Sequence, residues 1–243
     1  MTRNNRFRAM GNFMLVTCLS LAAGNGLRAQ QAAQKSAYVG RFHAYVGFSD
    51  IYAPFVNDLN QHGVDTQFGI NNTRWLATGF DYSAQTGTTQ LTPSLLPTAL
   101  QMALGAMLPT GYTLSVPTDV SIQTFSAGPQ LVYRHYTRAS FFVHPVLSAF
   151  RVYATPHPTD LVSTAVVGAL EQQGLLSSSG TKLDWTGGYG IGGGSDVNLS
   201  RHISAQFILD AAYTHPMNDL LANGGWVYRF SVGPAFHFGR NVH

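Results

Sequence analysis

The clearest pattern in the chain is a regular alternation of bulky apolar and small or polar residues over positions 226–238. The apolar row consists of Trp226, Tyr228, Phe230, Val232, Pro234, Phe236 and Phe238. A period of two places successive side chains on opposite faces of a β-strand. An aromatic face opposite a small, polar face is typical of a barrel with lipid outside and a polar lumen inside. A half-buried strand of a soluble sandwich has the same period, because periodicity does not identify the solvent.

Seven further segments show an alternation of this kind. With the first, the eight cover about residues 38–49, 63–71, 75–85, 120–136, 140–154, 183–197, 203–214 and 226–238. Most of them reach the ~9–11 residues with which a tilted strand crosses a bilayer. The segment at 140–154 alternates poorly, so its two faces cannot be assigned from the pattern.

The connections between these segments alternate between short and long. Short connections fall at 71–74, 137–139 and 198–202, and long ones at about 50–62, 86–119, 155–182 and 215–224. Outer-membrane barrels have this asymmetry, with short periplasmic turns and longer extracellular loops. The pattern therefore predicts an all-β fold: an eight-stranded antiparallel up-and-down transmembrane barrel.

Two of the long connections contain helical patterns of apolar residues, at 94–108 and 159–173. Long loops with structure of their own are often functional. One interpretation is a lid or a ligand pocket at the extracellular mouth of the barrel. The other is a pair of short helices that pack on each other and on the rim to bury their apolar faces, which is the usual reason for such faces.

The N-terminal part resembles a secretory signal. Three arginines precede an apolar run over residues 13–23, which is followed by Gly24-Asn25-Gly26 and by a candidate cleavage site, Leu27-Arg28-Ala29. Cleavage after Ala29 is expected, with Ala23 as the alternative. The run is too short to cross a bilayer as a helix. We therefore expect a signal peptide at 1–29, a linker at 30–37, the barrel at 38–239 and a tail at 240–243.

Composition supports a membrane barrel. Charged residues are 10% of the chain, against about 25% in ordinary soluble domains. Loss of the signal removes four of the 14 basic residues, which leaves ten against 11 acidic residues. The formal charge of +3 is therefore no argument for a nucleic-acid partner. The one cysteine, Cys18, lies in the signal, so no thiolate metal site is expected.

The C-terminal residues Gly233, Phe236 and Phe238 match the Gly-x-x-apolar-x-apolar signal of bacterial outer-membrane barrels. With the eight-segment pattern, the chain resembles the small OmpA/OmpX-type barrel family over about residues 38–238. The resemblance implies a monomer in a Gram-negative-type outer membrane, in contact with outer-membrane lipid and with the barrel-assembly machinery. Members of the family usually end on the aromatic residue, whereas five residues follow Phe238 here.

The inward-facing rows of the predicted strands carry ionisable side chains. They are Arg41, His43, Asp65, Asp81, Arg134, Asp184, Asp196, Asp210, Arg229 and His237. Buried charges persist when they are paired and hydrogen-bonded, so one interpretation is a structural ion-pair network. The alternative is a narrow or gated polar path. An eight-stranded barrel is only wide enough for side chains to fill its interior, which disfavours an open pore.

Candidate chemistry is sparse. His202 and Ser204 have the His-x-Ser spacing of the lipid A deacylase barrels, but no acidic residue is near in sequence and the pair lies at a predicted periplasmic turn. The glycines at 190–194 lack the spacing and the helix of a dinucleotide site. The histidines at 144, 157 and 215 lack metal-ligand spacing. No catalytic residue, cofactor or metal is expected.

The sequence thus favours a non-enzymatic outer-membrane barrel with a structural or surface-interaction role through its extracellular loops, whose ligand the sequence does not name. A narrow channel or transporter for a small or hydrophobic solute is the first alternative. An outer-membrane lipid-modifying enzyme is the second.

Overall fold

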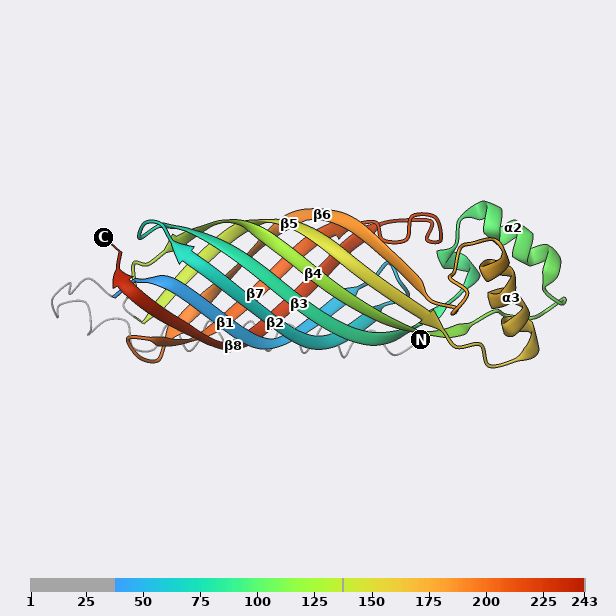
Figure 1. Cartoon of the computed structure of the whole chain (residues 1–243), viewed down its shortest axis with the longest axis horizontal. Coiled ribbons are helices and arrows are strands. Elements are labelled where there is room, and N and C mark those ends of the chain that lie inside the picture. Colours follow the sequence, from blue (N-terminus) through green and yellow to red (C-terminus); the bar gives the residue numbers. More distant parts are fainter. Residues whose placement is uncertain (1–37, 137, 243) are drawn as a thin grey trace, which may run out of the picture. The chain divides into compact units, whose positions relative to one another are not determined.

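The computed structural model describes residues 38–136 and 138–242; the predicted signal peptide and linker lie outside them. The described residues form a closed antiparallel barrel in which each strand pairs with its neighbours in the chain and β1 closes on β8 (Figure 1). The strands are β1 (Gly40–Ala53), β2 (Leu59–Asn71), β3 (Leu76–Leu91), β4 (Val116–Tyr133), β5 (Ala139–Pro156), β6 (Lys182–Asn198), β7 (Ile203–Thr214) and β8 (Gly225–Asn241). The predicted fold class is confirmed.

The short and long connections lie at opposite ends of the barrel. The turns β2–β3, β4–β5 and β6–β7 share one end with the C-terminus, and the helical loops extend from the other (Figure 1). The loops contain η1 (Pro93–Leu95), α2 (Thr98–Met107) and α3 (Leu161–Gln172). We call these the turn end and the loop end. The strands reach further towards the loop end than predicted, since β3 continues to Leu91 and β4 begins at Val116.

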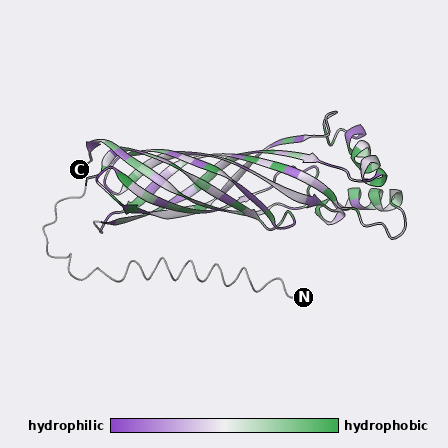
Figure 2. Ribbon diagram, turned by 90° about the horizontal axis from the view of Figure 1, so that it is seen from below, coloured by the Kyte–Doolittle hydropathy of each residue, from purple (hydrophilic) through white to green (hydrophobic). Residues whose placement is uncertain are grey.

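The outer surface of the barrel carries a belt of exposed apolar side chains. Hydrophobic and hydrophilic positions recur along the strands of the barrel wall (Figure 2). Aromatic residues lie near both edges of the belt. Towards the turn end they are Phe68, Trp75, Tyr133, Phe141, Phe236 and Phe238, and towards the loop end Tyr52, Trp185, Trp226 and Tyr228. An apolar band flanked by two aromatic girdles is how a barrel contacts a bilayer. The alternating rows of the closing strand thus face lipid and lumen as predicted.

No helix within residues 38–136 and 138–242 has the length and apolar content needed to cross a membrane.

Strand β5 also alternates between the two faces, although its sequence obscures this. Phe142, Val146 and Phe150 face inwards and are buried, whereas Val143 and Leu147 face outwards and are exposed. Both faces are therefore apolar over much of the strand, which removes the contrast that a period of two needs.

The wall changes character along strand β4. At the loop end Val120 and Ile122 face inwards and Ser121 faces outwards; nearer the turn end Gln130 faces inwards and Leu131 outwards. Even-numbered residues face inwards and odd-numbered residues outwards along the whole strand. The inward side chains change from apolar to polar towards the turn end, and the outward side chains change from polar to apolar. The strand is therefore apolar-in above the membrane, like a soluble barrel, and apolar-out within it.

The closing strand extends two residues beyond the boundary expected at 239. Gly40 pairs with Asn241 across the β1–β8 seam, and the Asn241 side-chain Oδ1 accepts a hydrogen bond from the Val39 backbone N at 2.8 Å. Part of the predicted tail thus belongs to the barrel and helps to close it.

Candidate functional site

The centre of the lumen is filled by an ion-pair cluster around Arg229, which lies on β8. The guanidinium Nη1 donates to Asp81 Oδ1 at 2.7 Å and to Ser83 Oγ at 2.8 Å. Nη2 donates to Asp210 Oδ2 at 2.5 Å, and Nε donates to the same oxygen at 3.1 Å. The fork of the guanidinium thus joins β8 to β3 and β7 across the interior, a geometry that lysine cannot reproduce.

Acidic groups outnumber basic ones in this cluster. Asp65 Oδ1 lies 3.7 Å from the Arg229 Nη1, so one guanidinium faces three buried carboxyl groups. The His144 Nε2 lies 3.1 Å from the second oxygen of Asp210. A cluster of this kind depends on its one arginine, because buried charges without a partner are costly.

Glycine makes room for the cluster. A Cβ added at Gly192 on β6 would lie 1.8 Å from Asp210 Oδ1 and 2.7 Å from His144 Nε2. The glycine-rich stretch at 190–194 is therefore explained by packing inside the narrow barrel and not by a nucleotide site.

A second polar layer lies nearer the turn end. The rings of His43 and His237 stack with their centroids 5.3 Å apart. The His43 Nε2 lies 2.9 Å from Gln206 Oε1, and Gln206 Nε2 donates to Gln67 Oε1 at 3.3 Å. This layer closes the lumen a second time with hydrogen-bonding side chains.

Two more members of the predicted network lie at the edge of this layer. Arg134 Nη2 donates to Asn71 Oδ1 at 2.7 Å, and its Nη1 donates to the backbone carbonyl of Arg74. Asp196 is buried and accepts a hydrogen bond from Ser140 Oγ at 3.3 Å. The predicted network is thus divided into two layers.

Two residues of the predicted network lie outside both layers. Arg41 is exposed at the turn end. Asp184 lies at the loop end, where its Oδ2 accepts from the backbone N of Met217 at 2.5 Å. Strand parity assigned Asp184 to the inward row but could not reveal that it lies above the central cluster, where it holds a loop.

The His202–Ser204 candidate does not form a pair. The Ser204 Oγ is buried and lies 2.9 Å from the Nε2 of His237, while His202 Nδ1 lies 3.0 Å from the His237 carbonyl oxygen. Ser204 is therefore part of the polar layer and faces the lumen. Within residues 38–136 and 138–242, no group of three or more His, Cys, Asp and Glu side chains is arranged to hold a metal ion.

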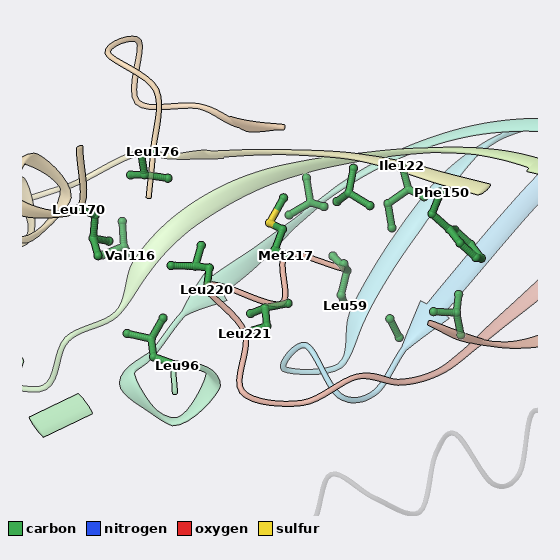
Figure 3. Packing of buried hydrophobic residues seen from close by; sticks show 14 of the residues in the cluster. Leu59, Leu96, Val116, Ile122, Phe150, Leu170, Leu176, Met217, Leu220 and Leu221 are labelled. Carbon is green, nitrogen blue, oxygen red and sulfur yellow. The ribbon is translucent and has the colours of Figure 1, made fainter. Parts of the chain in front are cut away.

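Above the Arg229 cluster the lumen opens into an apolar cavity whose lining residues the sequence pattern did not identify. Its volume is about 70 Å³. The barrel wall contributes side chains such as Leu59, Ile122 and Phe150, and the β7–β8 loop contributes Met217, Leu220 and Leu221 (Figure 3). We call this the apolar chamber. The signal that could have revealed it is the apolar inward row at the loop end of β4 and β5.

The apolar chamber offers no hydrogen-bonding group to an occupant. Its polar residues are three threonines, whose hydroxyls are used by backbone carbonyls. Thr89 donates to Val56, Thr118 to Val116 and Thr214 to Gly187, all at 3.1–3.2 Å. An empty apolar void of this size costs on the order of 2 kcal/mol at ~24 cal/mol per Å³.

The helical loops pack beside the chamber and share its apolar core. Leu96, Leu104 and Leu170 are buried in the same cluster as the chamber wall. Helix α3 begins with a capping box, in which the Asp160 side chain accepts from the Ser163 backbone N and the Ser163 side chain accepts from the Asp160 backbone N. The two predicted helical segments are confirmed, with shorter bounds.

The cap of α3 perturbs two titrating groups that lie beyond the membrane. Hydrogen bonds from the Ser163 backbone N and then from Tyr112 lower the pKa of Asp160. The hydrogen bond from the Tyr112 hydroxyl to Asp160 Oδ2, 2.7 Å long, raises the pKa of Tyr112. Both shifts favour the ionised carboxylate with the protonated phenol, which links the β3–β4 and β5–β6 loops.

Charge is distributed unevenly along the barrel axis. Among the described residues, the turn end carries six arginines and one acid: Arg41, Arg74, Arg134, Arg138, Arg201, Arg240 and Asp196. The loop end carries seven acids and two bases: Asp50, Asp58, Asp119, Asp160, Glu171, Asp184, Asp219, Arg151 and Lys182. The surface beyond the apolar belt is thus acidic at the loop end and basic at the turn end.

Comparison with known proteins identifies the fold. No protein-family model matches the chain, and no curated protein matches its sequence. Neisserial surface protein A (NspA) is 11% identical with a TM-score of 0.53, and the match covers 82% of this chain and 99% of that one. The outer membrane protein OprG from Pseudomonas aeruginosa is 11% identical with a TM-score of 0.47, over 84% and 98% of the two chains. Ail from Yersinia pestis, solved with a heparin analogue, is 11% identical with a TM-score of 0.42, over 82% and 99%.

The likeness to NspA concerns the fold alone. The exposed side chains of the barrel indicate that it lies in a membrane. The closed eight-strand topology, the apolar belt and the two aromatic girdles agree with each other. The described chain is a small eight-stranded barrel of the outer membrane.

Proposed function

We propose that this protein is a non-enzymatic surface-interaction barrel that acts through its loop end and does not conduct solutes. The observation that carries the proposal is the closed lumen. Arg229, held by three strands, is followed towards the turn end by the stacked His43 and His237 layer. Two successive layers of hydrogen-bonded side chains leave the loop end as the part that can meet external partners.

The loop end has the properties of a stable contact surface. The helical loops share a buried apolar core with the barrel, and Tyr112 links one loop to the capped N-terminus of α3 in the other. Acids outnumber bases on this end, so electrostatic attraction would favour cationic partners.

Conduction is the first test. Purified, refolded protein in planar bilayers should give no current steps above the lipid baseline, while a large porin added to the same bilayer confirms that insertion is detectable. The matched variants are Arg229→Ala, which removes the cluster's only arginine, and Arg138→Ala at the exposed turn end. Regular current steps from the wild-type protein would overturn the proposal in favour of a channel.

Surface contact is the second test. A variant in which residues 93–114 and 158–180 are replaced by short Gly-Asn turns should still insert and show heat-modifiable migration. In nanodiscs of zwitterionic lipid, the wild-type protein should bind immobilised polylysine in a salt-sensitive way, because exposed charges are screened by salt. Equal binding by the trimmed variant would show that the helical loops are not the contact surface.

Transport of a hydrophobic solute is favoured by one observation, the apolar chamber. The chamber ends on the Arg229 cluster, however, so an apolar solute would next have to cross buried charges. Passage along the whole barrel axis is therefore not part of the proposal.

A further inference from the structure

We propose that the apolar chamber is a binding site for the end of a linear alkyl chain. This goes beyond the surface role proposed above and does not depend on it. The chamber lies inside the loop end, between the Arg229 cluster and the loops, and strands β1 to β5, β7 and β8 contribute to its wall.

The lining determines the chemistry of the occupant. Every threonine hydroxyl in the wall already donates to a backbone carbonyl, and the surface that the chamber presents is entirely apolar. A polar group placed in the chamber would therefore lose its hydrogen bonds to water and gain none. Apolar cavities stay dry and take apolar ligands. The occupant is therefore hydrocarbon.

The size of the chamber determines the shape of its occupant. At about 70 Å³ it is roughly half the ~150 Å³ of an engineered apolar cavity that binds benzene. A ring of that size needs more room than the chamber offers. The end of an unbranched chain is narrower and can fill the space between Ile122, Phe150 and Leu221.

The position of the chamber places it within reach of such chains. Val227 lines the chamber, and its neighbours Trp226 and Tyr228 face outwards in the aromatic girdle near the loop end. Aromatic girdles mark the interface between lipid and water. The chamber is thus level with the outer surface of the bilayer.

The β1–β2 and β7–β8 loops complete the wall of the chamber at this height along the barrel, where the strands that they connect have ended. Strand β7 ends at Thr214 and β8 begins at Gly225, and Met217, Leu220 and Leu221 of the intervening loop form part of the lining. Phe55 and Val56 of the β1–β2 loop contribute in the same way. Side chains on loops can yield to a ligand without breaking strand pairing.

Methionine methyl signals provide a direct test. Met217 lines the chamber and is 4% exposed, while Met102 on α2 is 68% exposed. In protein labelled at the methionine methyl carbon and held in lipid nanodiscs, n-hexane should shift the Met217 signal to saturation. Met102 reports the non-specific effect of hexane and should change little. Cyclohexane should give no saturable shift.

Substitutions give the test its control. Ala53→Leu adds side-chain volume to the chamber wall and should abolish the saturable shift, whereas Ala44→Leu, on the outward row of the same strand, should preserve it. If Ala53→Leu fails to fold, Leu221→Ala provides the opposite change, since it enlarges the chamber and should admit cyclohexane. The absence of a saturable Met217 shift in folded wild-type protein would overturn the proposal, as would a Leu221→Ala variant that still excludes cyclohexane.

A membrane lipid and a free apolar solute carry the same alkyl chemistry, and a second arm separates them. Phospholipid with a nitroxide at the end of its acyl chain should broaden the Met217 signal more than a label near the headgroup does, if the bound chain belongs to lipid. Equal broadening by the two labels, together with the hexane shift, would assign the chamber to a free solute. Equal broadening without a hexane shift would overturn the site.

Discussion

Arg229 and Asp210 are directly opposed residues on β8 and β7, and the guanidinium Nη2 lies 2.5 Å from the carboxylate Oδ2. The same guanidinium reaches Asp81 on β3 through Nη1. One side chain thus joins the closing strand to its neighbour and to a strand on another part of the wall.

Removing this arginine should destabilise the barrel. Arg229→Ala leaves Asp65, Asp81 and Asp210 without their shared cation, and breaking a buried pair in this way costs about 3–5 kcal/mol. The urea midpoint of the folded, heat-modifiable band should fall accordingly. Arg138→Ala, at an exposed position, should leave the midpoint within error. An unchanged midpoint for Arg229→Ala would mean that the cluster is hydrated.

The glycine beside this cluster can be tested independently. Gly192→Ala places a Cβ 1.8 Å from Asp210 Oδ1, so the carboxylate or the strand must move. Overpacking of this kind costs about 1–3 kcal/mol. Gly187→Ala on the same strand is the control, because a Cβ there meets nothing within 4 Å. The two unfolding midpoints should differ, and equal values would contradict the packing explanation.

The exchange of polarity along β4 predicts that one substitution has a large effect on stability at one outward position and a small effect at another. Ala127→Arg places a charge in the lipid-facing belt, at a cost of about 2–4 kcal/mol if it lies near the bilayer midplane. Ser121→Arg places the same charge above the belt and should change stability by no more than about 0.5 kcal/mol. Unfolding in lipid vesicles measures both. Similar costs at the two positions would mean that the membrane covers the whole strand.

The C-terminal assembly signal remains a prediction. Replacing both Phe236 and Phe238 by Asp should lower the outer-membrane yield, because it removes the apolar positions of the signal and puts charge on the lipid-facing surface. Phe68→Asp changes the same girdle on β2 without touching the signal, so its yield should fall less. Cell fractionation measures the yields. A normal yield for the double variant would show that the signal lies elsewhere.

The cap of α3 should depend on pH. Because the pKa of Asp160 is lowered in the folded protein, its stabilising effect is complete above the ordinary Asp pKa of about 4 and is lost as the pH falls through the lowered value. Hydrogen exchange at the Ser163 amide, which donates to Asp160 Oδ1, should therefore lose protection in acid. Asp160→Asn removes this titration, so its protection should vary less. Equal pH profiles for the two proteins would contradict this linkage.

Much of the fold could be predicted from the sequence, because most strands place small polar residues opposite apolar ones. That contrast fails on β5, where Phe142 and Phe150 face the interior and Leu147 faces lipid. The charged interior was predicted only from the alternation of inward and outward residues along each strand. This alternation assigns a residue to a face of the wall but does not give its height along the barrel axis. Arg41 and Asp184 were grouped with Arg229 for this reason, although they lie near opposite ends.

The lining of the apolar chamber was missed for a related physical reason. Inward apolar residues were not expected in a membrane barrel, so the strand predicted at 120–136 gave no sign that Val120 and Ile122 line a cavity. Strands that continue beyond the membrane follow the rule of soluble barrels there. The loop packing that closes the chamber depends on contacts between distant segments, such as Leu220 with the barrel wall, which no local pattern reports.

The change of polarity on β4 also bears on membrane thickness. Between Ser121 and Phe125 the outward row passes from polar to aromatic, so the outer bilayer surface has one favourable height on this strand. A thicker bilayer would have to cover Ser121 and Gln123, or the barrel would have to tilt. The apolar belt of the protein therefore matches one hydrophobic thickness of the bilayer. Lipids with longer or shorter acyl chains would produce a hydrophobic mismatch at the loop end of the belt.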